Sequence, residues 1–130
     1  MEELFHLNLS ESTIEKMMTT CPKIKNMTNM DIKDKIYLLK EIGCSQKQIT
    51  HIICYNPKYL ENTHDKTIKI LQKLVDVGFK HMNTLLDANP MILNLEPLEF
   101  EQYIYQRLEF ESLEEIIIEL EENPKLFNTI

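Results

Sequence analysis

The sequence predicts an all-α protein built from about four stacked helix–turn–helix repeats. Four prolines recur at nearly constant spacing, at Pro22, Pro57, Pro90 and Pro124. A period of this length is typical of helical-repeat architectures. Only two glycines and a hydrophobic content of 43% fit helices around an ordered core. We expect one domain over residues 1–130, about seven main helices, and repeats spanning roughly 7–43, 44–78, 79–109 and 110–130.

The first helix of each repeat is expected to begin just after a serine that caps it. Ser10, Ser45 and Ser112 each lie at the same distance before their proline, and the third repeat has no such serine. Serine followed three residues later by Glu or Gln is the capping-box pattern. The pairs that fit this pattern are Ser12 with Glu15, Ser45 with Gln48, and Ser112 with Glu115.

Apolar residues inside these helices recur at i, i+3 and i+4, which is the spacing of one helical face packed on a core. Three sets follow this spacing: Ile14, Met17 and Met18; Ile49, Ile52 and Ile53; and Met82, Leu85 and Leu86. The fourth, Ile116, Ile117, Ile118 and Leu120, follows it only with a shift. Each helix should end at its proline, because the residue before a proline is disfavoured in helical conformation. A short turn, of the 3₁₀ type, then places an apolar anchor in the core. The anchors are Ile24, Leu60, Leu93 and Phe127.

A second helix is expected after the turn in the first three repeats. In the first two it ends at Gly43 or Gly78, because glycine readily adopts the left-handed cap conformation. In the third it should begin at Pro97, since proline suits the first helical position. The fourth repeat stops near Ile130 without a second helix and is expected to be a truncated terminal cap.

Two short motifs resemble the repeat of the mTERF (mitochondrial transcription termination factor-like) family. A Pro-x-x-Leu turn occurs at Pro57–Leu60 and Pro90–Leu93, with Pro124–Phe127 as a near match and Pro22–Lys25 as a departure. A Leu-x-x-apolar-Gly ending occurs at Leu39–Gly43 and Leu74–Gly78. The resemblance covers roughly residues 7–130. It implies a right-handed α-helical solenoid whose concave face often holds nucleic acid.

Charge is distributed unevenly along a chain whose net charge is −7. From Lys16 to Lys80 there are 12 lysines against six acidic residues, whereas from Glu96 onward ten acidic residues face only Arg107 and Lys125. Such asymmetry between halves is informative about partners.

A candidate nucleic-acid surface lies in the lysine-rich part. Lys47, His51, Tyr55 and Lys58 recur at i, i+4, i+8 and i+11, which places them on one helical face. A lysine row with an aromatic residue suits phosphate contacts and base stacking. A second row, on the following helix, consists of Lys66, Lys69 and Lys73. The simpler interpretation of both rows is an ordinary solvated helix face.

A second candidate surface is acidic and lies in the last repeat. Its residues are Glu109, Glu111, Glu114, Glu115, Glu121 and Glu122. Such a patch would meet a protein with a basic surface, and complementary charge speeds that encounter. The simpler interpretation is a solubilising outer face of a terminal repeat.

Nothing in the sequence points to an enzyme or to a cofactor. There is no Gly-rich phosphate loop, nucleophile elbow or zinc-protease motif. His51 and Cys54 would supply only two metal ligands, whereas a closed zinc site takes four, so no metal is expected. Three cysteines and no apparent leader or membrane span favour a reduced, cytoplasmic protein without a membrane partner.

Two functions remain open from the sequence, with self-assembly as a minor third. The leading hypothesis is a non-enzymatic interaction module that binds and modulates or inhibits a nucleic-acid-handling protein in the cytosol. The alternative is an RNA- or DNA-binding protein that uses the lysine-rich face of residues 16–80, as the mTERF resemblance implies.

Overall fold

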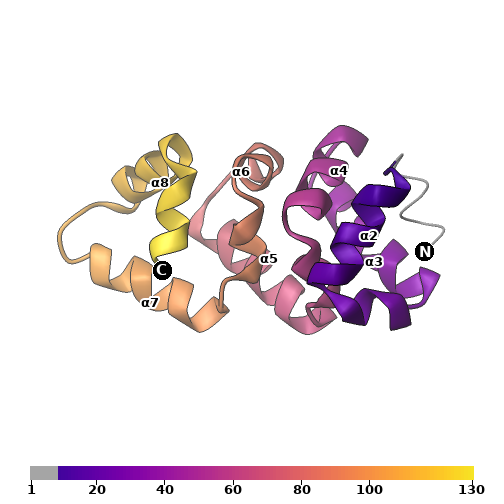
Figure 1. The fold of residues 1–130 in the computed structure, drawn as a ribbon. Helices are drawn as coiled ribbons and strands as arrows, with labels where there is room; N and C mark the ends of the chain where they lie inside the picture. Colours follow the sequence, from indigo (N-terminus) through magenta and orange to yellow (C-terminus); the bar gives the residue numbers. More distant parts are fainter. Residues whose placement is uncertain (1–8) are drawn as a thin grey trace. The chain divides into compact units, whose positions relative to one another are not determined.

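A computed structural model describes residues 9–130, and all regular structure within them is helical (Figure 1). The α-helices are α2 (Glu11–Thr20), α3 (Asn29–Glu41), α4 (Gln46–Tyr55), α5 (His64–Val77), α6 (Met82–Ala88), α7 (Pro97–Arg107) and α8 (Leu113–Glu122). The 3₁₀ helices are η1 (Pro22–Asn26), η2 (Pro57–Glu61), η3 (Pro90–Asn94) and η4 (Pro124–Thr129). The predicted all-α repeat class is confirmed. Residues 7 and 8, at the start of the first expected repeat, lie outside the described residues.

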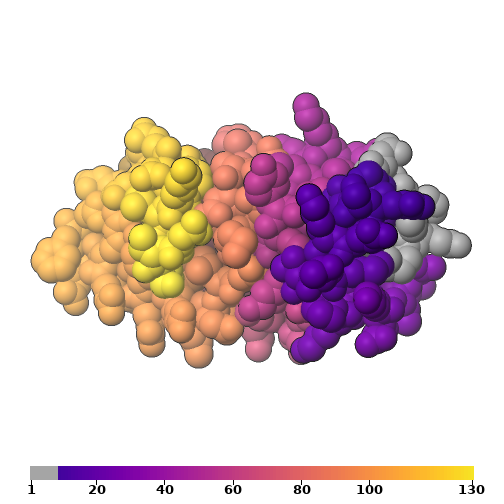
Figure 2. Space-filling model, viewed as in Figure 1, coloured from indigo at the N-terminus to yellow at the C-terminus, as the bar shows by residue number. Residues whose placement is uncertain are grey.

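The chain divides into two compact units, unit 1 (Met1–Asn62) and unit 2 (Thr63–Ile130). The division falls between η2 and α5, inside the expected repeat 44–78, and the single domain over 1–130 stays a prediction. Figure 2 shows the C-terminal residues of unit 2, in yellow, at the surface of the molecule. In residues 9–130, no helix is both long enough and apolar enough to cross a membrane.

Serine caps three of the four first helices, as predicted, but of the three expected capping boxes only that of Ser45 with Gln48 is complete. Ser45 accepts a hydrogen bond from the Gln48 amide and donates its own amide to the Gln48 side chain, which completes the expected capping box. The pair of Ser12 and Glu15 was predicted wrongly, because Ser10 already caps α2 two residues earlier with an extended backbone. Ser12 therefore lies inside the first turn. Ser112 caps α8 by accepting from the Glu115 amide, and α6 begins without a side-chain cap.

Each periodic proline is the first residue of a 3₁₀ helix, which confirms the predicted turns. The four anchors are at most 1% exposed: Ile24, Leu60, Leu93 and Phe127. Neighbouring turns pack on each other, η1 on η2 in unit 1 and η3 on η4 in unit 2. The turns therefore carry core residues between repeats rather than only reversing the chain.

The second helices also end and begin where the sequence predicts. Gly43 and Gly78 have φ of 96° and 115°, a left-handed conformation that side-chain-bearing residues rarely adopt. Pro97 is the first residue of α7. One cap was missed by the sequence analysis: Thr28 and Asp31 form a capping box at the start of α3.

Tyr59 and Lys35 join η2 to α3 in the core of unit 1. The Tyr59 hydroxyl donates to the Lys35 carbonyl at 2.7 Å, and the Lys35 ammonium lies 5.3 Å from the centroid of the Tyr59 ring. The ring is fully buried, and Lys35 is only 5% exposed. Burial disfavours the charged ammonium and lowers the pKa of Lys35 to about 8.

Lys35 is expected to make folding stability rise between about pH 8 and pH 9.5. In the unfolded chain a lysine has a pKa of about 10.4 and stays protonated over this range. In the folded protein Lys35, with a pKa of about 8, loses its proton. Because the unfolded state binds more protons, stability increases by at most about 1.4 kcal/mol per pH unit.

Urea unfolding of the wild type and of Lys35→Met from pH 7 to pH 9.5 measures this effect. The wild type should gain stability relative to the variant as the pH rises, because methionine carries no titrating group. A constant difference between the two proteins over that range would contradict the prediction.

Asn89 links two turns of unit 2. Its side-chain amide donates to the Pro124 carbonyl at 2.8 Å and to the Asn128 side chain at 3.0 Å, while its oxygen accepts from the Met91 amide. Asparagine before a proline tolerates turn geometries that other side chains resist. In the structure Asn89, which is 5% exposed, also connects the third repeat to the fourth through these hydrogen bonds.

Candidate nucleic-acid interface

The predicted first row lies along the outer face of α4 and continues into η2. Lys47 and Lys58 lie toward solvent, and the rings of His51 and Tyr55 contact each other with centroids 4.4 Å apart. Tyr55 is 71% exposed. The row faces outward because the other side of α4 is buried through Ile49, Ile52 and Ile53, all 0% exposed. Lys47, His51 and Tyr55 therefore share one face of α4, and Lys58 is exposed in η2, beyond the Pro57 turn.

A second row at the matching positions of the first repeat escaped the sequence analysis. Lys16 lies six residues before Pro22, as His51 does before Pro57, and Lys23 directly follows its proline, as Lys58 does. Both lysines are exposed, on α2 and η1, and η1 packs on η2. Counting positions from each proline would have found this row. We call Lys16, Lys23, Lys47, His51, Tyr55 and Lys58 together the unit 1 face.

The matching positions carry less positive charge in the later repeats. Counted from the proline, the third repeat has Lys80, Thr84, Ala88 and Met91, and the fourth has Glu114, Ile118, Glu122 and Lys125. These four positions thus change from basic in the first two repeats to acidic in the fourth. A polyanion would therefore be attracted to these positions in the first two repeats and repelled from them in the fourth.

The predicted second lysine row lies on α5, where two of its members form ion pairs within unit 2. Lys66 pairs with Glu96 and Lys73 with Glu101, both with nitrogen–oxygen distances of 2.9 Å. Lys69 is exposed. The glutamates belong to α7 or to the residue that precedes it, so the row serves partly to hold α5 to α7. Its use in binding stays a prediction.

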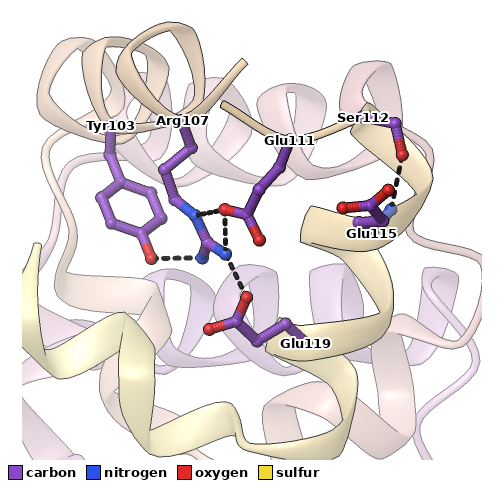
Figure 3. A network of polar contacts seen from close by, with 6 residues as sticks. All are labelled: Tyr103, Arg107, Glu111, Ser112, Glu115 and Glu119. Carbon is purple, nitrogen blue, oxygen red and sulfur yellow. Dashed lines mark hydrogen bonds and ion pairs between the residues drawn. The ribbon is translucent and has the colours of Figure 1, made fainter. Parts of the chain in front are cut away.

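The acidic candidate surface is partly neutralised by the only arginine of the chain (Figure 3). The Arg107 guanidinium donates to Glu111 at 2.8 Å, to Glu119, and to the Tyr103 hydroxyl at 2.7 Å. Burial alone would lower the pKa of Arg107, but the hydrogen bonds to Glu111, Tyr103 and Glu119 together raise it. The remaining members are exposed: Glu109, Glu114, Glu115, Glu121 and Glu122.

The two units differ in charge as well as in position along the chain. Over its full range, unit 1 has eight lysines against eight acidic residues, a balance of zero. Unit 2 has five lysines and one arginine against 13 acidic residues, a balance of −7. A negatively charged ligand is therefore repelled less by unit 1 than by unit 2.

The cysteines offer no reactive or metal-binding centre in the described residues. Cys21 and Cys44 are buried, as expected of core residues, and Cys54 is half-buried. Burial raises the pKa of the Cys54 thiol, and the pKa of the Cys21 thiol is raised by burial and then by Glu61. Raised values keep both thiols protonated and weakly nucleophilic. Residues 9–130 contain no cluster of three or more potential metal ligands.

Comparison with known proteins agrees with the repeat pattern. No curated protein matches this chain. The family model described as mTERF matches residues 1–127, which is nearly the whole chain. The periodic prolines, the buried anchors after them and the glycine-capped second helices are thus repeats of a known family, and the chain belongs to the mTERF family.

Proposed function

We propose that the protein binds single-stranded nucleic acid through the unit 1 face. The observation that carries the proposal is the pair of matched rows on consecutive repeats, which combine exposed lysines with one exposed aromatic ring. Membership of the mTERF family supports the same conclusion, because the family's helical repeats are associated with nucleic-acid binding. The family relation by itself does not select a surface.

The lysines of the unit 1 face are available for phosphate contacts. Within residues 9–130, no ion pair joins Lys16, Lys23, Lys47 or Lys58 to a carboxylate, in contrast to Lys66 and Lys73. A lysine that neutralises a phosphate releases condensed counterions, which favours binding at low salt. Four such lysines give a moderate, strongly salt-dependent affinity.

Tyr55 supplies the contact that favours single strands over duplexes. Its ring is 71% exposed and is held against His51, which gives it a defined orientation. A base can stack on such a ring only when it is unpaired, because bases in a duplex already stack on their neighbours. Stacking of this kind contributes about 1–3 kcal/mol per base.

Reversing two charges of the unit 1 face is expected to weaken oligonucleotide binding by at least about tenfold at low salt. The variant is Lys47→Glu with Lys58→Glu, and the probe is a fluorescein-labelled oligouridylate or oligothymidylate of about 12 nucleotides. Fluorescence anisotropy over a salt series should also show a shallower salt dependence, by about 0.7 in the logarithmic slope for each lost contact. Tyr55→Ala should weaken binding by about fivefold or more with little change in that slope.

Lys125→Glu is the matched control for Lys58→Glu. Both lysines directly follow a periodic proline, but Lys125 lies in the acidic fourth repeat. We expect Lys125→Glu to leave binding nearly unchanged. If Lys58→Glu alone and Lys125→Glu weakened binding equally, or if the wild type did not bind at low salt, the unit 1 face would be rejected as the binding site.

Contact with a basic protein surface is a second candidate function, and it is located in unit 2. The supporting observation is the exposed acidic row of α8, where Glu114 and Glu122 occupy positions that hold Lys47 and Tyr55 in the second repeat. A partner that handles nucleic acid would carry such a basic surface. Modulation or inhibition of that partner is the corresponding proposal for function.

A further inference from the structure

Unit 2 contains an apolar groove, and one of its lining residues is Lys73 of the predicted second lysine row. The groove has a volume of about 260 Å³ and runs between α5 and α7, ending at the first residue of α8. Its floor and walls are mainly apolar: Val77, Phe100, Ile104, Tyr105, Leu108 and Leu113. Small-molecule sites typically measure about 300–1,000 Å³, so this groove suits one or two anchoring side chains of a larger partner.

The outer face of α7 exposes apolar residues at helical spacing beside this groove. Leu98, Tyr105 and Leu108 lie at i, i+7 and i+10, and are 71%, 65% and 41% exposed. Leu113, at the end of the groove, is 38% exposed. A stripe with this spacing is the surface against which an amphipathic helix packs in helix-in-groove recognition. The groove with this stripe is called the α5–α7 groove below.

The charges around the α5–α7 groove specify the chemistry of its occupant. The charged residues that line it are Lys73, Asp76 and Glu101. Glu101 pairs with Lys73, whereas the bond described for the Asp76 carboxylate comes from the neutral Gln72 side chain. Glu109 and Glu114 are exposed in the segment that connects α7 to α8 and in α8 itself. An occupant with basic side chains beside its apolar face is therefore complementary.

A second copy of the same groove is a poor occupant. Pairing two such faces would bring together two units that each carry a balance of −7. Like charges placed opposite each other at an interface oppose association. An acidic helix or a nucleic-acid strand would be repelled for the same reason.

We propose that the α5–α7 groove docks a basic amphipathic helix of a partner protein. One apolar side chain of that helix lies over Val77, Ile104 and Leu108, Tyr105 covers it from the side, and lysine or arginine residues face Asp76. The inference rests on the second candidate function, which it deepens by naming the anchor site and the class of partner. It is independent of nucleic-acid binding by unit 1.

Synthetic peptides added to the full chain test the proposal. The first probe is a labelled amphipathic peptide with leucine on one face and lysine elsewhere, made long enough to form a helix in water. The second has the same composition in an order that leaves no apolar face. We expect the amphipathic peptide to bind at least about tenfold more tightly than the scrambled one in anisotropy titrations, since the groove recognises an apolar face and not charge alone.

Variants locate the binding site on the protein. Tyr105→Ser should weaken binding of the amphipathic peptide by about tenfold, whereas Tyr37→Ser, an equally prominent tyrosine of unit 1 with 57% exposure, should not. Asp76→Lys, at an exposed position that lines the groove, should also weaken binding and does not depend on removing an apolar side chain. Circular dichroism and thermal unfolding check that each variant folds.

The outcomes separate this inference from the function on which it rests. Suppose that both peptides bind equally, and that binding is lost when Glu114, Glu115, Glu121 and Glu122 are changed to glutamine. This result would support a charge-based contact with the acidic surface and would overturn docking in the α5–α7 groove. No binding of either peptide would overturn both. Self-association of the chain that Tyr105→Ser abolishes would assign the groove to a second copy and also overturn the proposal.

Discussion

Replacing Phe127 by alanine is expected to destabilise unit 2 by about 3–5 kcal/mol. Phe127 is the anchor of the fourth turn, is fully buried, and lies with its ring centroid 5.9 Å from that of Phe79 and 6.0 Å from that of Phe100. These rings come from different parts of the unit. Removing the phenyl group leaves a cavity that the surrounding helices can fill only partly.

Urea unfolding followed by circular dichroism, with hydrogen exchange to locate the loss, measures this effect. Phe110→Ala is the matched control, since Phe110 is 86% exposed and should change stability by no more than about 0.5 kcal/mol. Small domains are typically stable by about 5–15 kcal/mol, so the loss in Phe127→Ala is a large fraction of the free energy of unfolding. Most amides of unit 2 should therefore exchange faster in this variant. Equal losses in the two variants would show that the turns do not anchor the repeats.

Replacing Arg107 by alanine is expected to cost about 2 kcal/mol of stability, concentrated where α7 meets α8. The Arg107 side chain is only 15% exposed and binds Glu111 and Glu119, which are 29% and 46% exposed. Its loss leaves two carboxylates close together without their shared cation. The effect is smaller than for a fully buried ion pair, since water reaches Glu119.

The loss on replacing Arg107 should be partly reversed by a second change. Glu119→Gln in the Arg107→Ala background removes one of the two repelling carboxylates, so it is expected to recover part of the stability. Arg107→Lys should fall between the wild type and alanine, because lysine keeps the charge but lacks the planar fork that reaches several partners at once. Hydrogen exchange of the α8 amides measures the local stability of the wild type, the two single variants and the double variant. An alanine variant as stable as the wild type would contradict this account of the network.

The fold was predictable because its signals are local. Pro57 ends α4 and opens η2 whatever surrounds it, Gly78 takes a conformation that other residues avoid, and Ser45 with Gln48 satisfies its own helix start. The error at Ser12 has the same origin: Ser10 fits the spacing from Pro22 and Ser12 fits the capping-box pattern with Glu15, and these local signals do not choose between them. Local rules thus placed nearly every element of the described chain.

The candidate surfaces were less predictable because they depend on which helices become neighbours. Lys66 and Lys47 look alike in the sequence, yet in the described residues only Lys66 has a glutamate from another element beside it, at 2.9 Å. Arg107 looks like a minor charge within an acidic segment, whereas it bridges Glu111, just after its own helix, and Glu119, in the next one. Pairings of this kind follow from packing, which residue spacing within one helix does not encode.

Lys23 shows that repeats can recover part of this missing information. Nothing in its own turn distinguishes it, but its position after Pro22 matches that of Lys58 after Pro57, and η1 packs on η2. A surface that continues from one repeat to the next is therefore visible in the sequence once the repeats are aligned. The change from basic to acidic residues along this register was visible in the same way.

The most direct test of nucleic-acid binding by unit 1 is a backbone amide NMR titration of the full chain with oligothymidylate at low salt. The account predicts chemical-shift changes concentrated on α2, η1, α4 and η2, with the largest at Tyr55 and its neighbours. Changes confined to α5 around Lys69, or centred on α8, would contradict it.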